Sequence, residues 1–204
     1  MGRLIRVGAW VAAATLAGCS GGREATRPDG EQADGERLAE NIVQARRGDE
    51  RVNEYDLNGD KRPDVWSFTV TAKGEDGKEY QRLVRKELDI NWDGKVDIVK
   101  YYDAKEQLER ESYDHDFDGK VDQVNFFEKG VVVRKERDIT GDGKVDTWIF
   151  FEKGKIARKE RDTNNDGRVD YWEYWEGDHV DRVGEDLDGD GQVDRWTKNP
   201  DSEG

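Results

Sequence analysis

The chain has 204 residues, of which 40% are charged and 33% hydrophobic, and its formal net charge is −14. A chain this acidic repels phosphate, which excludes nucleic acid as a partner and favours cations or basic protein surfaces. High charge with low hydrophobicity is typical of disorder or of a charged repeat protein, and the aromatic content of 10% argues against disorder throughout.

Residues 1–18 have the pattern of a secretory signal peptide. Two arginines precede an apolar stretch that is too short to span a bilayer, and the stretch ends in Leu-Ala-Gly followed by Cys19, the only cysteine of the chain. This tetrapeptide resembles the lipobox of bacterial lipoproteins. The resemblance implies cleavage before Cys19, acylation of that residue and membrane attachment through the N-terminal lipid. With Ser20 next, it implies a location in the bacterial cell envelope, at the outer membrane. The alternative is a plain signal peptide with a chance cysteine.

Residues 19–50 are rich in Gly, Glu, Arg and Asp, which predicts a lipidated, flexible and polar tether. Leu38, Ile42 and Ala45 lie at helical spacing, so a short helix over residues 36–47 is a possible interruption of that tether. Residues 51–198 are predicted to form the folded repeat domain, and residues 199–204 a disordered tail.

An acidic segment of nine residues recurs six times in the predicted domain. The segments start at Asp56, Asp89, Asp114, Asp138, Asp162 and Asp186, so that the last three intervals are each 24 residues. β-branched and aromatic residues alternate between the segments, and each interval contains a turn such as Lys153-Gly154. This pattern predicts two strands per repeat. The predicted fold is all-β, an antiparallel meander of tandem β-hairpins; a small propeller-like arrangement or a closed barrel is the alternative.

Alternation also predicts the two faces of the sheet. One face carries an aromatic ladder that includes Trp66, Trp148, Trp172 and Trp196. The arginines at 85, 110, 134, 158 and 182 recur on the following strands, and we expect one aromatic face and one charged face. The ladder is interpreted mainly as core, with an exposed sugar- or protein-binding stripe as the alternative.

Each acidic segment places oxygen-bearing side chains at positions 1, 3, 5 and 9, and five of the six have Gly at position 6. Calcium takes six to eight oxygen ligands in flexible geometry, and the glycine permits the sharp turn that brings them together. Zinc is disfavoured because the chain has no Cys or His cluster. The candidate ligands, in chain order, are Asp56, Asn58, Asp60, Asp64, Asp89, Asn91, Asp93, Asp97, Asp114, Asp116, Asp118, Asp122, Asp138, Thr140, Asp142, Asp146, Asp162, Asn164, Asp166, Asp170, Asp186, Asp188, Asp190 and Asp194.

The segments resemble the first part of an EF-hand loop and the calcium loops of FG-GAP/VCBS and thrombospondin type 3 repeats. The resemblance implies up to six Ca²⁺ ions. A complete EF-hand needs Glu at position 12 and flanking helices, whereas only Glu173 meets the first condition and the flanks read as strands. The first segment is the weakest site because Lys61 replaces the glycine. A solvated acidic turn without metal is the alternative.

No nucleophile–base pair stands out in the sequence, and His115 and His179 are expected to be exposed polar residues. The predicted function is a non-enzymatic calcium-binding envelope lipoprotein that acts as a structural, scaffold or adhesion module, with a protein or polysaccharide as possible partner. The alternatives are a carbohydrate or cell-wall binder that uses the aromatic ladder, Trp92 or Trp175, and a calcium-dependent hydrolase.

Overall fold

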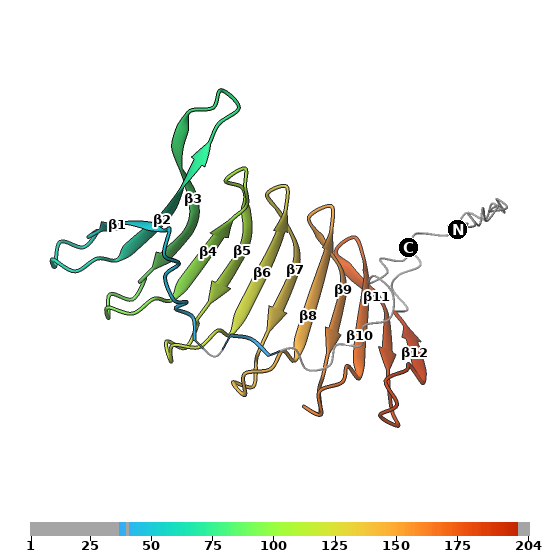
Figure 1. The fold of residues 1–204 in the computed structure, drawn as a ribbon. Helices are drawn as coiled ribbons and strands as arrows, with labels where there is room; N and C mark the ends of the chain where they lie inside the picture. Colours follow the sequence, from blue (N-terminus) through green and yellow to red (C-terminus); the bar gives the residue numbers. More distant parts are fainter. Residues whose placement is uncertain (1–36, 40, 200–204) are drawn as a thin grey trace, which may run out of the picture.

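The computed structural model describes residues 37–39 and 41–199; the signal segment, Cys19 and the last residues of the tail lie outside this range. The described part forms one sheet of twelve strands in chain order (Figure 1). The strands are β1 (Arg51–Tyr55), β2 (Val65–Lys73), β3 (Glu79–Leu88), β4 (Ile98–Tyr102), β5 (Leu108–Tyr113), β6 (Gln123–Glu128), β7 (Val131–Arg137), β8 (Thr147–Glu152), β9 (Lys155–Arg161), β10 (Tyr171–Glu176), β11 (His179–Glu185) and β12 (Arg195–Lys198).

Every neighbouring pair of strands is antiparallel, so the predicted all-β meander is confirmed. The six acidic segments connect odd strands to the following even strands and therefore all lie at one edge of the sheet, whereas the hairpin turns lie at the other (Figure 1). β1 and β12 are the two ends of the strand order and do not pair with each other, so the sheet is open and the closed alternatives are wrong. The described ranges contain no helix of the length and apolarity needed to cross a bilayer.

The β6–β7 and β8–β9 hairpin turns are tight because their residues accept the left-handed conformation. Lys129 and Gly130 have φ of 52° and 78°, and Lys153 and Gly154 have 51° and 79°. Positive φ at both central residues is the signature of a type I′ turn, whose twist matches that of the flanking strands. Two-residue turns of this kind set the register of β6 with β7 and of β8 with β9.

A β-bulge in each of the five hairpins corrects the predicted division of side chains between the faces. In the β6–β7 hairpin, Phe126 pairs with Arg134 while Phe127 pairs with Val132, so Val133 is an extra residue. Simple alternation would place Val132 and Arg134 on one face, and the bulge moves them to opposite faces. Arg134 therefore shares a face with Phe126, and Val132 with Phe127.

The aromatic face is consequently also the charged face, contrary to the prediction. An arginine guanidinium lies 4.0–4.7 Å from an aromatic ring centroid in every hairpin, and the pairs are Arg85–Phe68, Arg110–Tyr101, Arg134–Phe126, Arg158–Phe150 and Arg182–Tyr174. Cation–π contacts of this kind contribute from about 0.5 kcal/mol to about 2 kcal/mol when desolvated. The sheet thus needs no second layer over these rings, because the arginines of the neighbouring strand cover them.

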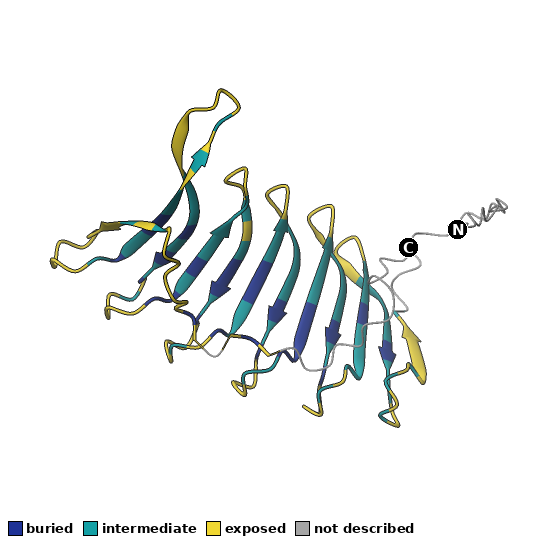
Figure 2. Ribbon diagram, in the orientation of Figure 1, coloured by how far each residue is buried: buried dark blue, intermediate teal, exposed yellow. Residues whose placement is uncertain are grey.

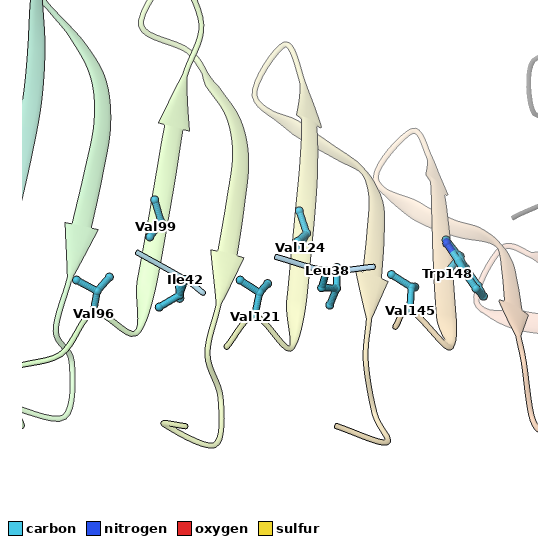
Figure 3. Packing of buried hydrophobic residues seen from close by; sticks show 8 residues of the cluster. All are labelled: Leu38, Ile42, Val96, Val99, Val121, Val124, Val145 and Trp148. Carbon is cyan, nitrogen blue, oxygen red and sulfur yellow. The ribbon is translucent and has the colours of Figure 1, made fainter. Parts of the chain in front are cut away.

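The core lies at the loop end of this face, where residues 37–39 and 41–50 cross the sheet (Figures 2 and 3). Leu38 and Ile42 are buried in one cluster with Val96, Val121 and Trp148, among others. Trp148 is 0% exposed, so the interpretation of the ladder as core is confirmed at its centre, whereas Trp196 at the end is 50% exposed.

The sequence predicted a flexible tether over residues 19–50, with a possible short helix over residues 36–47. The described residues of this segment instead pack on the sheet and are not helical. The amide of Leu38 donates to the carbonyl of Gly143 and that of Ile42 to the carbonyl of Gly119, each at 3.1 Å, and no described residue of this stretch is helical. Two apolar side chains anchor an otherwise polar segment because they complete a cluster of valines that the single sheet leaves uncovered.

Candidate metal-binding loops

The six acidic segments form six loops with one backbone conformation. We number them loop 1 (residues 56–64), loop 2 (89–97), loop 3 (114–122), loop 4 (138–146), loop 5 (162–170) and loop 6 (186–194). Positions 4 and 6 have positive φ in all six loops; the values run from 60° at Asn165 to 92° at Gly119. Two left-handed residues two apart fold the chain back on itself within each loop.

The carboxylate at position 1 organises each loop from its centre. In loop 4 the two oxygens of Asp138 accept hydrogen bonds from the amides of Gly141 and Gly143, both at 2.6 Å. In loop 2 the oxygens of Asp89 accept from Trp92 and Gly94, both at 2.7 Å. Each carboxylate oxygen has two lone pairs, so an oxygen that accepts one amide keeps a second site for a cation.

The carboxylate at position 9 closes the loop from the opposite side. The Oδ2 atom of Asp97 accepts hydrogen bonds from the amides of Ile90 at 2.8 Å and Asn91 at 3.2 Å, and Asp97 is only 1% exposed. Asp64 and Asp146 make the same pair of contacts in loops 1 and 4 and are also buried. Burying a carboxylate is costly unless it is hydrogen-bonded and paired with a positive charge.

Positions 3 and 5 form Asx turns and remain nearer to solvent. Asn91 accepts the amide of Asp93 at 2.9 Å, and Asp93 accepts the amide of Lys95 at 2.8 Å. The equivalent contact at position 5 recurs in all six loops. Each of these contacts uses one side-chain oxygen, so an aspartate keeps its other oxygen for a ligand.

Backbone hydrogen bonds join the bases of successive loops into one row. The amide of Asp97 donates to the carbonyl of Leu88 at 2.8 Å and closes loop 2, and the amide of Asp114 donates to the carbonyl of Asp97 at 2.9 Å and joins loop 3 to it. The same alternation runs from Asp64 to Asp194. The carboxylates of positions 1 and 9 are therefore held in a line along the sheet edge, and the loops also touch directly, since the Asn165 amide group donates to Asp142 at 3.1 Å.

Two loops bring three carboxylates to a common centre. The ligand oxygens of Asp114, Asp116 and Asp122 in loop 3, and of Asp188, Asp190 and Asp186 in loop 6, lie within 4.8 Å of one another. Loops 3 and 6 are the two with aspartate at all four candidate positions, and the other loops carry Asn or Thr at position 3. Three carboxylates at this separation can hold a metal ion.

The pKa values of the first aspartates of the two clusters shift in opposite directions. Burial raises the pKa of Asp114 and outweighs the lowering by the amides of Gly119 and Phe117. Burial also acts to raise the pKa of Asp186, but the amides of Gly191 and Gly189 outweigh it and the net shift is downward. The buried carboxylate in loop 3 is thus destabilised in its charged form without a cation, while the more open loop 6 is stabilised by its own amides.

Of the 24 candidate ligands, the described structure groups the carboxylates of six, three in loop 3 and three in loop 6. The sequence analysis missed one shared feature of the loops. Position 4 needs a positive φ as much as position 6 does; glycine fills it in loops 1, 4 and 6, but Trp92, Phe117 and Asn165 fill it in the others. The sequence indicates this requirement through the glycine at position 4 in three of the six segments.

Lys61 tests the glycine requirement at position 6, because its φ of 73° is strained for a side chain with a Cβ. We expect Lys61→Gly to raise the free energy of unfolding by about 1 kcal/mol, measured by urea denaturation. The matched control is Lys95→Gly at position 7 of loop 2, which has no positive φ and should lose stability or stay unchanged. Equal stabilisation by both variants would contradict the strain at Lys61.

Neither the family models nor the curated proteins that were compared with this chain match it. Solved structures do match, among them accessory secretory proteins 1, 2 and 3 of Streptococcus pneumoniae, with 16% identity over 70% of this chain and 23% of that chain, at a TM-score of 0.35. TarM matches with 16% identity over 62% of this chain and 20% of its own, also at 0.35. This chain spans about a fifth of the length of both.

The comparison corrects one sequence-based prediction. The chain was predicted not to be an enzyme, and beside these matches that prediction is withdrawn. At a TM-score of 0.35 the matches supply no activity in its place.

Proposed function

We propose that this chain is a calcium-binding repeat protein of the bacterial cell envelope, in which cations bound in the loops hold successive hairpins together as a scaffold. The observation that carries the proposal is the line of hydrogen-bonded carboxylates at one edge of the sheet, buried along most of its length. Because each loop joins two strands and its base is bonded to the next loop, an ion in one loop restrains both neighbours.

Electrostatics supports this role. Each loop holds three or four aspartates within a turn of nine residues. Two unit charges about 4 Å apart repel by about 4 kcal/mol at the effective dielectric constant typical of a protein surface. Some of this repulsion is offset by loop lysines, such as Lys120, whose ammonium lies 2.5 Å from Asp118. A divalent cation offsets more of it, since it contacts several carboxylates at once.

The ligand chemistry favours calcium among the common divalent ions. All candidate ligands are oxygens, which suits Ca²⁺ and Mg²⁺ and disfavours a structural zinc site. Magnesium requires near-ideal octahedral geometry and gives up its waters reluctantly, whereas calcium accepts six to eight ligands at variable angles. A loop with four oxygen-bearing side chains therefore suits calcium better.

Calorimetric titration of the demetallated full chain with CaCl₂ tests the proposal, with Asp122→Asn as the variant. Asn keeps a side-chain oxygen that can accept the amides of His115 and Asp116, at 2.6 and 3.3 Å, but removes a charge that all six loops carry at position 9, so we expect one calcium fewer per chain or one site at least tenfold weaker. The control is Asp103→Asn, because Asp103 accepts the amides of Lys105 and Gln107 in a hairpin turn far from the loops. If both variants bind as the parent does, loop 3 is not a site.

The envelope location rests on the lipobox and has its own test. We expect Cys19→Ser to move the protein from the membrane fraction to the soluble fraction after cell lysis, because an N-terminal lipid is the proposed anchor. The measurement is immunoblotting of fractionated cells, with Ser20→Ala as the control that keeps the cysteine. A Cys19→Ser protein that remains with the membrane would contradict lipid anchoring.

A further inference from the structure

The two end strands of the described sheet, β1 and β12, occupy different positions in the repeated unit. Each unit consists of an odd strand, an acidic loop and an even strand, from β1–loop 1–β2 to β11–loop 6–β12. Inside the sheet, every even strand pairs on its far side with the odd strand of the next unit. β12 is an even strand and β1 is an odd strand. The outer edge of β12 therefore corresponds to the edge that pairs with an odd strand inside the sheet, and the outer edge of β1 to the edge that pairs with an even strand.

The number of strands makes these two ends geometrically compatible. Twelve antiparallel strands alternate in direction, so a second copy shifted along the sheet would place its β1 antiparallel to β12 of the first copy. The loops of both copies would then lie along the same edge, and the aromatic faces would be continuous. An odd number of strands would not allow this continuation.

We propose that β12 of one copy pairs with β1 of the next, so that copies extend one sheet head to tail. The β10–β11 pair gives the register, since Tyr171 after loop 5 faces Glu185 before loop 6, and Trp172 faces Gly184. The equivalent junction places Arg195 opposite Tyr55, Trp196 opposite Glu54, Thr197 opposite Asn53 and Lys198 opposite Val52.

The side chains brought together at this junction already occur as partners inside the sheet. Trp148 faces Glu136 on one side and Glu160 on the other. Tyr171 faces Arg161, whose guanidinium lies 5.7 Å from the ring centroid. Trp196 with Glu54 and Arg195 with Tyr55 would repeat these two kinds of pair, which are stabilising cross-strand contacts.

The Lys198–Val52 pair differs from the interior pair at the same place in the register. Inside the sheet an odd strand supplies an arginine that covers a ring on the even strand, as Arg158 covers Phe150. At the junction the odd strand supplies Val52 and the even strand supplies Lys198. The aliphatic stem of a lysine packs on valine, and its ammonium lies diagonally opposite Glu54 in this register.

Exposure and charge both favour pairing of unlike ends. All four residues of β12 are exposed, and Trp196 is 50% exposed where the interior Trp148 is 0% exposed. Tyr55 on β1 is also 50% exposed. Arg195 is ion-paired with Glu185 at 2.7 Å. Two β12 strands would set Arg195 of each copy opposite Lys198 of the other, whereas β1 offers Lys198 the diagonal Glu54 carboxylate, which favours pairing of unlike ends over a symmetric dimer. Pairing of unlike ends does not close and produces chains of copies.

Disulfide trapping tests the register in the full chain. In a Cys19→Ser background, Asn53→Cys and Thr197→Cys together place one thiol on each end strand, both at exposed positions. Twelve strands at about 4.8 Å separate the two sites by about 50 Å within one chain, so any disulfide must join two copies. We expect a reducible ladder of dimers, trimers and longer species under mild oxidation. The control pairs Asn53→Cys with Arg195→Cys, two residues out of register, and should yield about tenfold less product.

Two results would overturn the proposal. One is a matched pair that yields no more multimer than the mismatched pair. The other is Thr197→Cys alone dimerising as fast as the matched pair, since that would show symmetric pairing of β12. Sedimentation of the unmodified chain provides a test without cysteines: the average mass should rise with concentration, and a constant monomer mass over the accessible range would also reject the head-to-tail contact.

Discussion

Removal of calcium by a chelator is expected to lower the midpoint of thermal unfolding of this chain by more than about 10 °C. At a free calcium concentration a hundredfold above the dissociation constant, each filled site stabilises the folded state by about 2.7 kcal/mol. Several loops act together because their bases are joined by backbone hydrogen bonds. Circular dichroism at the β-sheet signal, with and without EGTA, measures the shift.

Two additions make the chelation result specific. Calcium added back in excess should restore the original midpoint, and magnesium at the same concentration should restore less of it, because its geometry requirements are stricter. A chain that melts at the same temperature with and without EGTA would show that the loops are stable acidic turns held by their own amides. The hydrogen bonds of Asp138 and Asp97 would then suffice for the observed loop conformation.

Replacement of Trp148 by alanine is expected to lower the free energy of unfolding by about 3–5 kcal/mol. Trp148 is 0% exposed and belongs to the cluster that joins Leu38 of the N-terminal segment to the sheet. Truncation leaves a cavity that the two strands on either side cannot close, since both are fixed by register with β8. Urea denaturation in saturating calcium isolates this effect from metal binding.

Trp148→Phe is the matched control. It keeps an aromatic ring and removes an indole N–H that is buried with no hydrogen-bond partner in the described part of the chain. Phenylalanine should therefore cost much less than alanine at this position. If alanine and phenylalanine destabilise equally, the indole nitrogen rather than the packing of the ring determines the contribution of Trp148.

The repeat period and the turn residues carried enough information to predict the architecture. Lys153-Gly154 marks a hairpin turn and the recurring aspartates mark the loops, because both local conformations are encoded in a few adjacent residues. The candidate ligands could be placed for the same reason.

The division of side chains between faces could not be predicted because it depends on a bulge. Val133 is an ordinary β residue, and nothing in its identity shows that it lacks its own partner on β6. The bulge is what places Arg134 over Phe126 and makes one face both aromatic and cationic. Leu38 and Ile42 were misread for a related reason: their burial depends on valines that lie more than fifty residues further along the chain.

Counting the calcium ions bound to the demetallated chain by native mass spectrometry tests the central claim most directly. The account predicts saturable uptake of several ions per chain, up to one for each of the six loops, with loop 1 the last to fill because Lys61 stands at its position 6. If the folded chain shows no saturable uptake of calcium at any calcium concentration, the account is contradicted.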